Sequence, residues 1–479
     1  MRILTLNPPF LPKFSRASRS PEVTKGGCLY YPYWLAYATG VLEKEGFDVK
    51  LIDGVAADWG MHDVMKFVDK FKPDLTVIST STPSIFNDID YGVKIKKRTG
   101  SFVTLVGTHV TALPGEALKR KGIDSVARGE YDYTIRDLVY TLKSGRPLKK
   151  IKGLSFKQKR KIIHNPNRPL IKDLDEIPFA SKVYERHLDI KRYFYPTVQH
   201  PEVTILTSRG CKFQCAFCLY ANIFWKGTYR FRSAKNVADE LEYIENNLDV
   251  KEVMFEDATF SAAYTKDRVR EICKEIIKRK IEIGWVANSR ADVDYETLNL
   301  MKKAGCRELC VGFESAEQAV LNGIPKGLVL RQSRKFMEAA NNAGIVVHGC
   351  FILGLPGETK ETVEKTIDFA LELDPETIQV FPMMVYPGTP AFKWAEKNGF
   401  LRTKDWSKWI KNDGTHNCMI IRPELTSKYL VEKCDEALKK FYLRRGKIIE
   451  LIFSIKSLSD LERFYRGFKV FIKYLHEKR

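Results

Sequence analysis

Three cysteines, Cys211, Cys215 and Cys218, follow one another with three and two residues between them, and Phe217 precedes the last. Thiolates at such close spacing are typical ligands of an iron–sulfur cluster. A [4Fe-4S] cluster takes one ligand at each iron, so three protein thiolates leave one iron open to a small molecule that carries an amine and a carboxylate. The loop therefore predicts a cluster that binds and activates such a molecule.

A zinc site is the alternative for three clustered cysteines. Zinc sites usually combine one C-x2-4-C pair with a distant C-x2-C or H-x3-5-H pair, and no such partner stands out here. Cys306 and Cys310 are close in sequence, but Cys306 follows Gly305 at a helix end and Cys310 lies in an apolar strand. We therefore expect buried thiols at these two positions rather than a second cluster.

Length and composition bound the class of protein. A chain of 479 residues exceeds what one hydrophobic core usually organises, so we expect two or three domains. Hydrophobic residues make up 44% of the chain, yet no apolar run is long enough to span a bilayer, and the N-terminus has the pattern of a strand. Ten scattered cysteines do not suit a disulfide framework. These features predict a cytoplasmic enzyme.

The chain is strongly basic, with a formal net charge of +20. A positive field attracts nucleic acid, anionic lipid or a phosphorylated substrate. Part of the excess lies at the end, since residues 439–479 hold 12 Lys and Arg against 4 Asp and Glu. We expect residues 415–479 to form a helical basic region with an apolar stripe. Such a helix either lies peripherally on an anionic membrane or packs on the preceding domain with its charges in solvent.

An N-terminal domain, residues 1–146, contains the first elements that must position the cysteine loop. Short apolar strands alternate there with amphipathic helices, which is typical of a doubly wound parallel sheet. Such a sheet binds ligands at the carboxyl ends of its strands, and the lack of G-x-G-x-x-G after the first strand disfavours a dinucleotide. The expected strands are Arg2–Asn7, Asp48–Asp53, Leu75–Ser79, Val103–Gly107 and Ser125–Ala127.

A second set of elements surrounds the cysteine loop itself. Residues 147–199 are predicted to form a hairpin and a linker, because turn-forming residues interrupt them. Residues 200–414 contain six strand–helix units, which predicts a partial parallel barrel with its active site at the carboxyl ends of the strands. The cysteine loop follows the first of these strands. The expected strands are Val203–Thr207, Glu252–Phe255, Glu282–Asn288, Glu308–Phe313, Val346–Leu353 and Thr377–Val385.

With these features together, the chain resembles the cobalamin-binding-domain radical S-adenosylmethionine (SAM) family, which includes cobalamin-dependent methylases and the anaerobic Mg-protoporphyrin cyclase. Leu35–Tyr37, Asp53, Gly107–Pro114 and Arg128–Glu130 also look like recurrent segments of that family. The resemblance implies an α/β chain with an N-terminal cobalamin-binding domain, a (β/α)6 radical SAM barrel and a helical basic tail. It also implies that the three cysteines bind the cluster.

The resemblance further implies which strand ends bind SAM. Acidic groups after the second barrel strand are placed to accept hydrogen bonds from the methionine ammonium, and polar groups after the third and fourth strands suit the ribose and carboxylate. A glycine after the fifth strand allows close approach of adenine. The implied SAM residues are Glu256, Asp257, Asn288, Arg290, Glu314, Ser315 and Gly354. Ion pairs that close the barrel mouth are the alternative role of the charged members.

Cobalamin is implied between the two domains. Domains that supply a lower histidine ligand carry D-x-H-x-x-G, and none of the eight histidines has that context, so no histidine is expected below the cobalt. His109 is expected to contact the corrin edge or tail, with ordering of its own loop as the alternative. The implied cobalamin residues are Ser79, Thr82, Gly107, His109 and Gly129. A domain that has lost the cofactor and serves as a scaffold is the other interpretation.

The family's shared chemistry is cleavage of SAM to a 5′-deoxyadenosyl radical. We therefore expect cobalamin-dependent C-methylation of an apolar, lipid-like or tetrapyrrole-like metabolite, with radical cyclisation or rearrangement as the alternative. An electron donor such as ferredoxin or flavodoxin is implied. RNA modification is disfavoured, because methylthiotransferases carry three further cluster cysteines in the N-terminal domain, where the first 200 residues here hold only Cys28. A non-enzymatic metal-binding scaffold is the last alternative.

Overall fold

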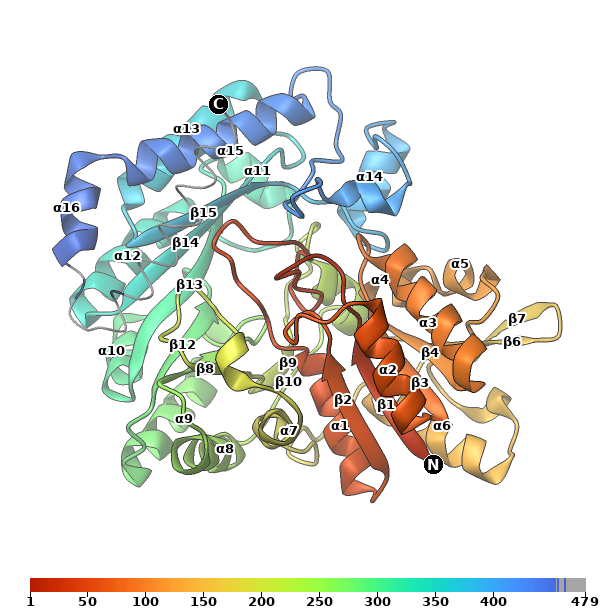
Figure 1. Cartoon of the computed structure of the whole chain (residues 1–479). Helices are drawn as coiled ribbons and strands as arrows, with labels where there is room; N and C mark the ends of the chain where they lie inside the picture. Colours follow the sequence, from red (N-terminus) through yellow and green to blue (C-terminus); the bar gives the residue numbers. More distant parts are fainter. Residues whose placement is uncertain (454, 456–460, 462–479) are drawn as a thin grey trace.

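The computed structural model describes residues 1–453, 455 and 461. Two α/β units lie side by side, the first coloured red to yellow and the second green to blue (Figure 1). The loop of residues 8–32 runs between them. Within the described part of the chain, no helix is long and apolar enough to cross a membrane.

The N-terminal unit is built on a seven-stranded sheet with the order β2-β1-β3-β4-β5-β6-β7. Its strands are β1 (Arg2–Asn7), β2 (Asp48–Asp53), β3 (Leu75–Thr80), β4 (Phe102–Gly107), β5 (Ser125–Ala127), β6 (Leu154–Gln158) and β7 (Lys161–His164). Its helices are α1 (Tyr33–Lys44), α2 (Met61–Phe71), α3 (Ile85–Thr99), α4 (Thr108–Ala112), α5 (Pro114–Lys119) and α6 (Asp132–Ser144). The five parallel strands β1 to β5 confirm the predicted doubly wound sheet.

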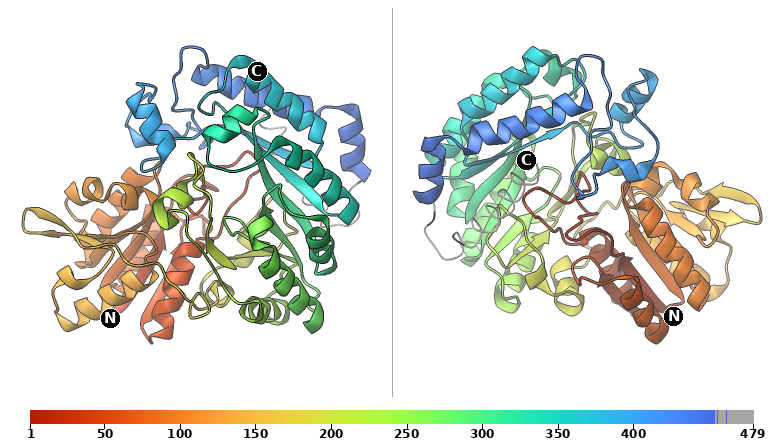
Figure 2. Two further views of the ribbon diagram at one scale, coloured as in Figure 1. Left: turned by 180° about the vertical axis from the view of Figure 1, so that it is seen from behind. Right: turned by 45° about the horizontal axis from the view of Figure 1, so that its top comes forward.

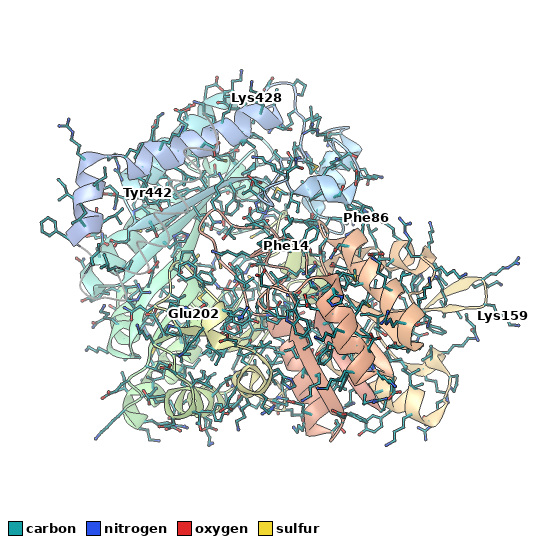
Figure 3. All side chains as sticks on the ribbon, in the orientation of Figure 1. Phe14, Phe86, Lys159, Glu202, Lys428 and Tyr442 are labelled. Atoms are coloured by element: carbon teal, nitrogen blue, oxygen red, sulfur yellow. The ribbon has the colours of Figure 1, made fainter. Side chains whose placement is uncertain are left out.

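The predicted hairpin also forms, but it belongs to the sheet rather than to a separate connector. Strand β6 pairs antiparallel with β5, and β7 pairs antiparallel with β6. Lys159 lies at the tip of this hairpin, which projects away from the molecule (Figure 3). The sheet edge gains two strands because Leu154 and Phe156 bury their side chains against it.

The second unit is a partial barrel of six parallel strands in the order β15-β14-β13-β12-β11-β8. The strands are β8 (Glu202–Ile205), β11 (Glu252–Phe255), β12 (Gly284–Ser289), β13 (Cys306–Glu314), β14 (Val346–Leu353) and β15 (Thr377–Pro382). Helices lie along the outside (Figure 2): α7 (Ala180–His187), α8 (Ala234–Asn247), α9 (Lys266–Arg279), α10 (Tyr295–Lys303), α11 (Gln318–Gly323), α12 (Leu330–Ala343) and α13 (Lys360–Leu373). The predicted six strand–helix units are confirmed.

A short antiparallel ribbon, β9 (Ser208–Gly210) and β10 (Tyr229–Phe231), encloses the cysteine loop and joins the two units. Arg209 of β9 lies 2.8 Å from Asp132 of α6, and Arg230 of β10 lies 2.6 Å from Glu130. All four side chains are largely buried. Because a buried charge is costly without its partner, these pairs fix the position of the ribbon against the N-terminal unit.

The C-terminal helices α14 (Pro390–Lys397), α15 (Ser427–Tyr442) and α16 (Arg445–Phe453) complete the described chain. Helix α15 lies along the edge strand β15 (Figure 3), where the Tyr442 hydroxyl accepts from the Ile378 amide at 2.8 Å and donates to its carbonyl at 2.9 Å. The helix thereby covers an open sheet edge. A helical tail that packs on the barrel is confirmed for α15, whereas residues 454, 456–460 and 462–479 lie outside the described part.

Candidate functional site

The cysteine loop is held by contacts of the residues on either side of it. Gly210 has φ of +113°, and a Cβ there would lie 1.9 Å from the Thr228 carbonyl oxygen. The Asn222 side chain donates to the carbonyl oxygens of Cys215 and Cys218 at 2.9 and 2.7 Å. The loop is therefore held by a glycine before the first cysteine and by an amide after the last.

Two cations flank the thiols of this loop. Burial raises the pKa of Cys215 to about 12, and the nearby Lys326 lowers it. Burial likewise raises the pKa of Cys218, and Arg19 lowers it. Thiolate ligands carry negative charge, so these cations and a bound metal would favour the ionised form.

Asp257 anchors the strand that leads into the loop. Its carboxylate accepts hydrogen bonds from the Thr207 amide at 2.6 Å, the Thr207 hydroxyl at 2.5 Å, the Ser208 amide at 3.1 Å and the Ser208 hydroxyl at 2.7 Å. The side chain is fully buried. These four contacts occupy the carboxylate, so in this structure Asp257 positions the cysteine loop.

Glu256, by contrast, faces a residue of the N-terminal loop. Its carboxylate accepts from the Asn288 side chain at 3.2 Å and lies 3.4 Å from the Arg19 guanidinium. Arg19 also donates to the Asp257 carbonyl at 2.6 Å, while its Nε is buried without a partner among the described residues. Burial raises the pKa of Glu256, and the charge of Arg19 opposes that effect. Glu256 and Asn288 therefore meet beside the cysteine loop, as predicted, together with an arginine that no sequence motif marks.

Arg290 contacts the cysteine loop, and Glu314 pairs with a lysine that lies near it. The Arg290 guanidinium lies 3.8 Å above the Phe213 ring of the cysteine loop and donates to Asp292 at 2.8 Å. Glu314, at a φ of +66°, forms an ion pair with Lys326, which also donates to the Gly312 carbonyl at 2.5 Å. Backbone strain of this kind at a non-glycine residue is typical of functional sites. Lys326, like Arg19, lies outside any pattern that the sequence displays.

Ser315 and Gly354 meet around a buried carboxylate, Glu358. The Gly354 amide donates to Glu358 at 2.5 Å, and the Ser315 hydroxyl donates to it at 3.4 Å. Gly354 has φ of +92°, and a Cβ there would lie 2.7 Å from Leu430 of α15. Burial raises the pKa of Glu358 to about 7. The glycine is thus required by the turn and by α15, and adenine contact at this position stays a prediction.

A cavity lies where the N-terminal sheet faces the barrel. It is bounded by the carboxyl ends of β1, β3 and β4 and by aromatic side chains of α1 and of the segment after the cysteine loop. Its lining includes Asn7, Arg16, Tyr30, Trp34, Ser79, Thr80, Gly107, Thr108, Tyr131, Tyr220 and Phe224. The Trp34 Nε1 is buried without a partner among the described residues. This orphaned donor is available to a bound polar molecule.

Of the predicted cobalamin residues, Ser79 and Gly107 line this cavity. Gly107 has φ of +123°, and a Cβ there would lie 2.2 Å from the Thr80 carbonyl oxygen, so the turn after β4 requires a glycine. The Gly129 amide donates to the Thr111 hydroxyl at 3.1 Å. Contact of Ser79, Gly107 and Gly129 with cobalamin stays a prediction.

His109 is buried and is not among the residues that line the cavity. Its Nδ1 lies 3.2 Å from the Thr82 hydroxyl, its ring packs edge-on against Trp406, and its Nε2 has no partner among the described residues. Burial lowers the pKa of His109 to about 3, so the ring is neutral. The structure therefore brings His109 and Thr82 together, and contact of either with the corrin stays a prediction.

Comparisons with known proteins agree with both halves of this site. The radical SAM superfamily model matches residues 205–370, and the B12 binding domain model matches residues 23–139. An uncharacterized methyltransferase, PH0819, of Pyrococcus horikoshii is 36% identical over 88% of this chain and 90% of its own length. An anaerobic magnesium-protoporphyrin IX monomethyl ester cyclase of Rubrivivax gelatinosus is 30% identical over 72% of this chain and 62% of its own length.

A solved structure shares the arrangement of domains. The radical SAM methyltransferase TsrM of Kitasatospora setae, solved with cobalamin and a [4Fe-4S] cluster, superposes with a TM-score of 0.71. The match covers 92% of this chain and 88% of that protein at 17% identity, which shows the fold alone. The predicted order of domains therefore recurs in a protein whose structure holds cobalamin and a [4Fe-4S] cluster.

Proposed function

Because the chain belongs to the radical SAM family with an N-terminal cobalamin-binding domain, we propose that it methylates an unactivated carbon of an apolar small molecule. It is a cobalamin-dependent radical SAM methyltransferase with a [4Fe-4S] cluster, SAM and cobalamin as its cofactors. One observation supports chemistry between the two cofactors: Tyr220 and Phe224, which line the cavity at the sheet ends, lie two and six residues after Cys218. One short segment thus forms a wall of that cavity and continues the cysteine loop.

The residues around the loop have separable tasks. Cys211, Cys215 and Cys218 would hold the cluster, which supplies the electron that cleaves SAM, while cobalamin supplies the methyl group. Glu256 and Asn288 offer an acceptor pair for the methionine ammonium, and Arg19 offers a donor for a carboxylate. Asp257 and Arg290 hold the loop in place, because productive geometry depends on fixed positions. An external electron donor of the ferredoxin or flavodoxin type completes the cycle.

The apolar class of substrate is supported by the surface of α16. Ile449, Ile452 and Phe453 are 54%, 60% and 77% exposed, and Leu443 before the helix is 54% exposed. Arg445 begins the same helix. Exposed apolar side chains on a helix that begins with a basic residue suit the surface of an anionic membrane, where an apolar substrate would be found.

The test is incorporation of a labelled methyl group. The protein would be produced anaerobically with hydroxocobalamin. It would then be supplied with trideuteromethyl-SAM, a reductant and a lipid extract of the organism that encodes it. A lipid product that carries the label would support methylation, and the Cys215→Ala variant should give none. A product that loses hydrogens and carries no label would contradict methylation and favour radical cyclisation. The Rubrivivax gelatinosus relative is named a cyclase.

A further inference from the structure

A second group of soft metal ligands lies inside the barrel, apart from the cysteine loop. The sulfur atoms of Cys310 in β13 and Cys350 in β14 are 3.5 Å apart. A ring nitrogen of His348 joins them, so that the three ligand atoms all lie within 4.8 Å of one another. Each of the three residues is half-buried. The expectation of a buried thiol is thus confirmed for Cys306 and wrong for Cys310.

The register of the sheet explains why these side chains meet. Cys310 pairs directly with His348 across the parallel ladder, and Gly312 pairs with Cys350. Side chains two residues apart on one strand point to the same face, so His348 and Cys350 share a face, and Cys310 shares it with them. The residues between them, such as Leu309 and Val311, are fully buried and face the outer helices. The three ligands therefore project into the barrel.

The same register favours a metal over a disulfide. Cys310 and Cys350 are diagonal rather than direct neighbours. Diagonal partners in a sheet have Cα atoms about 7–8 Å apart, which is beyond the range in which disulfides form. A tetrahedral zinc ion with Zn–S bonds of about 2.3 Å places its two sulfurs ~3.8 Å apart. The observed sulfur separation of 3.5 Å is close to that value.

The surroundings prepare the ligands for a cation. Nδ1 of His348 lies 2.7 Å from the Thr377 hydroxyl, which holds the ring in one orientation. The two thiols would release their protons when a metal binds.

We propose that Cys310, His348 and Cys350 bind one zinc-class divalent cation, with a fourth position open to the barrel interior. Two thiolates, one imidazole and one exchangeable oxygen ligand form a donor set that zinc uses at catalytic sites. Two thiolates neutralise the charge of a divalent cation, which suits the interior of a barrel. The fourth position would take water or an alcohol oxygen. The proposal does not rest on the methyltransferase reaction, because its ligands are separate from the cluster loop.

Cobalt(II) is the probe for this site, because its thiolate charge-transfer and tetrahedral d–d absorption report the ligands directly. The full chain with Cys211, Cys215 and Cys218 all replaced by Ala, and without a polyhistidine tag, would be titrated anaerobically. We expect both bands to saturate at one cobalt per chain and to be displaced by zinc. Adding Cys350→Ser or His348→Ala should weaken cobalt binding by at least about tenfold.

The matched control is Cys306→Ser on the same strand, which should leave the titration unchanged. Zinc, iron and sulfide analysis of the wild-type holoenzyme and of Cys350→Ser provides a second measurement. We expect the variant to lose zinc and to keep its cluster. The proposal is overturned if the bands are absent from a chain whose far-ultraviolet circular dichroism is native, or if Cys350→Ser binds cobalt as tightly as its parent.

Discussion

Arg19, from the loop that follows the first strand of the N-terminal domain, lies 3.4 Å from Glu256 at the end of the second barrel strand. The two residues are separated by 237 positions in the sequence. This ion pair brings the loop between β1 and α1 into direct contact with the site beside the cysteine loop, and it leaves one buried guanidinium nitrogen without a partner among the described residues.

Replacement of Arg19 should therefore weaken SAM binding. We expect Arg19→Met to raise the dissociation constant of SAM by about tenfold or more, because a charged hydrogen bond to SAM is lost. Without the guanidinium, the pKa of Glu256 should rise further, so binding should require higher pH. Calorimetric titration of SAM at several pH values measures both effects. Lys13→Met, an exposed change in the same loop, should bind SAM as the wild type does. Equal affinities in the two variants would contradict the assigned role.

The carboxylate of Asp257 should be needed for loading of the cluster. In Asp257→Asn the amide cannot accept all four hydrogen bonds from Thr207 and Ser208, so the cysteine loop loses its anchor. We expect a loss of about 1–3 kcal/mol in the free energy of unfolding and a clear fall in iron content. Iron analysis and urea unfolding check this. Asp267→Asn, on the first turn of α9, is the control and should retain iron. Full iron content in Asp257→Asn would show that the cysteine loop binds its cluster without this anchor.

Gly107→Ala should prevent retention of cobalamin. The new Cβ would meet the Thr80 carbonyl at 2.2 Å, so the backbone at the end of β4, beside the cavity, must shift. Gly100→Ala is the matched control, because Gly100 also has a positive φ but no atom within 4 Å of the added Cβ. Cobalt analysis after desalting should find cobalamin with Gly100→Ala and little with Gly107→Ala. If both variants keep cobalt, the cavity at the end of β4 is not the cofactor site.

Glu358 should make unfolding depend on pH. Burial raises its pKa in the folded chain to about 7, above the value of 4.5 in the unfolded chain. The folded state then binds the proton more tightly, so stability is largest below about pH 4.5 and falls as pH rises toward 7. Glu358→Gln should flatten this dependence by about 3 kcal/mol over that window. Urea unfolding of the metal-free full chain across the window measures it, and an unchanged slope in the variant would assign the dependence to other groups.

The apolar surface of α16 should bind anionic membranes. Replacing Ile449, Ile452 and Phe453 with Ser removes exposed side chains without touching the buried core. We expect sedimentation with phosphatidylglycerol vesicles to fall by about tenfold or more, whereas phosphatidylcholine vesicles should bind little of either protein. Ile421→Ser, an exposed apolar change outside α16, is the control. Undiminished binding of the triple variant would remove the membrane from the proposal.

Local sequence patterns determined much of the fold. Strands β1, β11 and β14 begin and end where their apolar runs predict, and the strand–helix alternation predicts both the doubly wound sheet and the six-stranded barrel. The cysteine spacing predicts the cluster for a similar reason. The ligands lie within eight residues, so one turn of chain brings them together. Glu256 and Asn288 could also be placed, because the carboxyl ends of neighbouring parallel strands share one edge.

Only the tertiary structure decided which groups meet across long separations. Nothing near Arg19 or Lys326 in the sequence marks them, since their partners Glu256 and Glu314 are brought close by domain packing and by a loop after β13. The pairing of β6 with β5, and the diagonal of Cys310 and Cys350, depend on sheet order and register. The sequence by itself therefore determined the elements and the cluster loop, whose chemistry is local. The cofactor cavity and the second group of metal ligands arise from contacts between elements, which local periodicity does not encode.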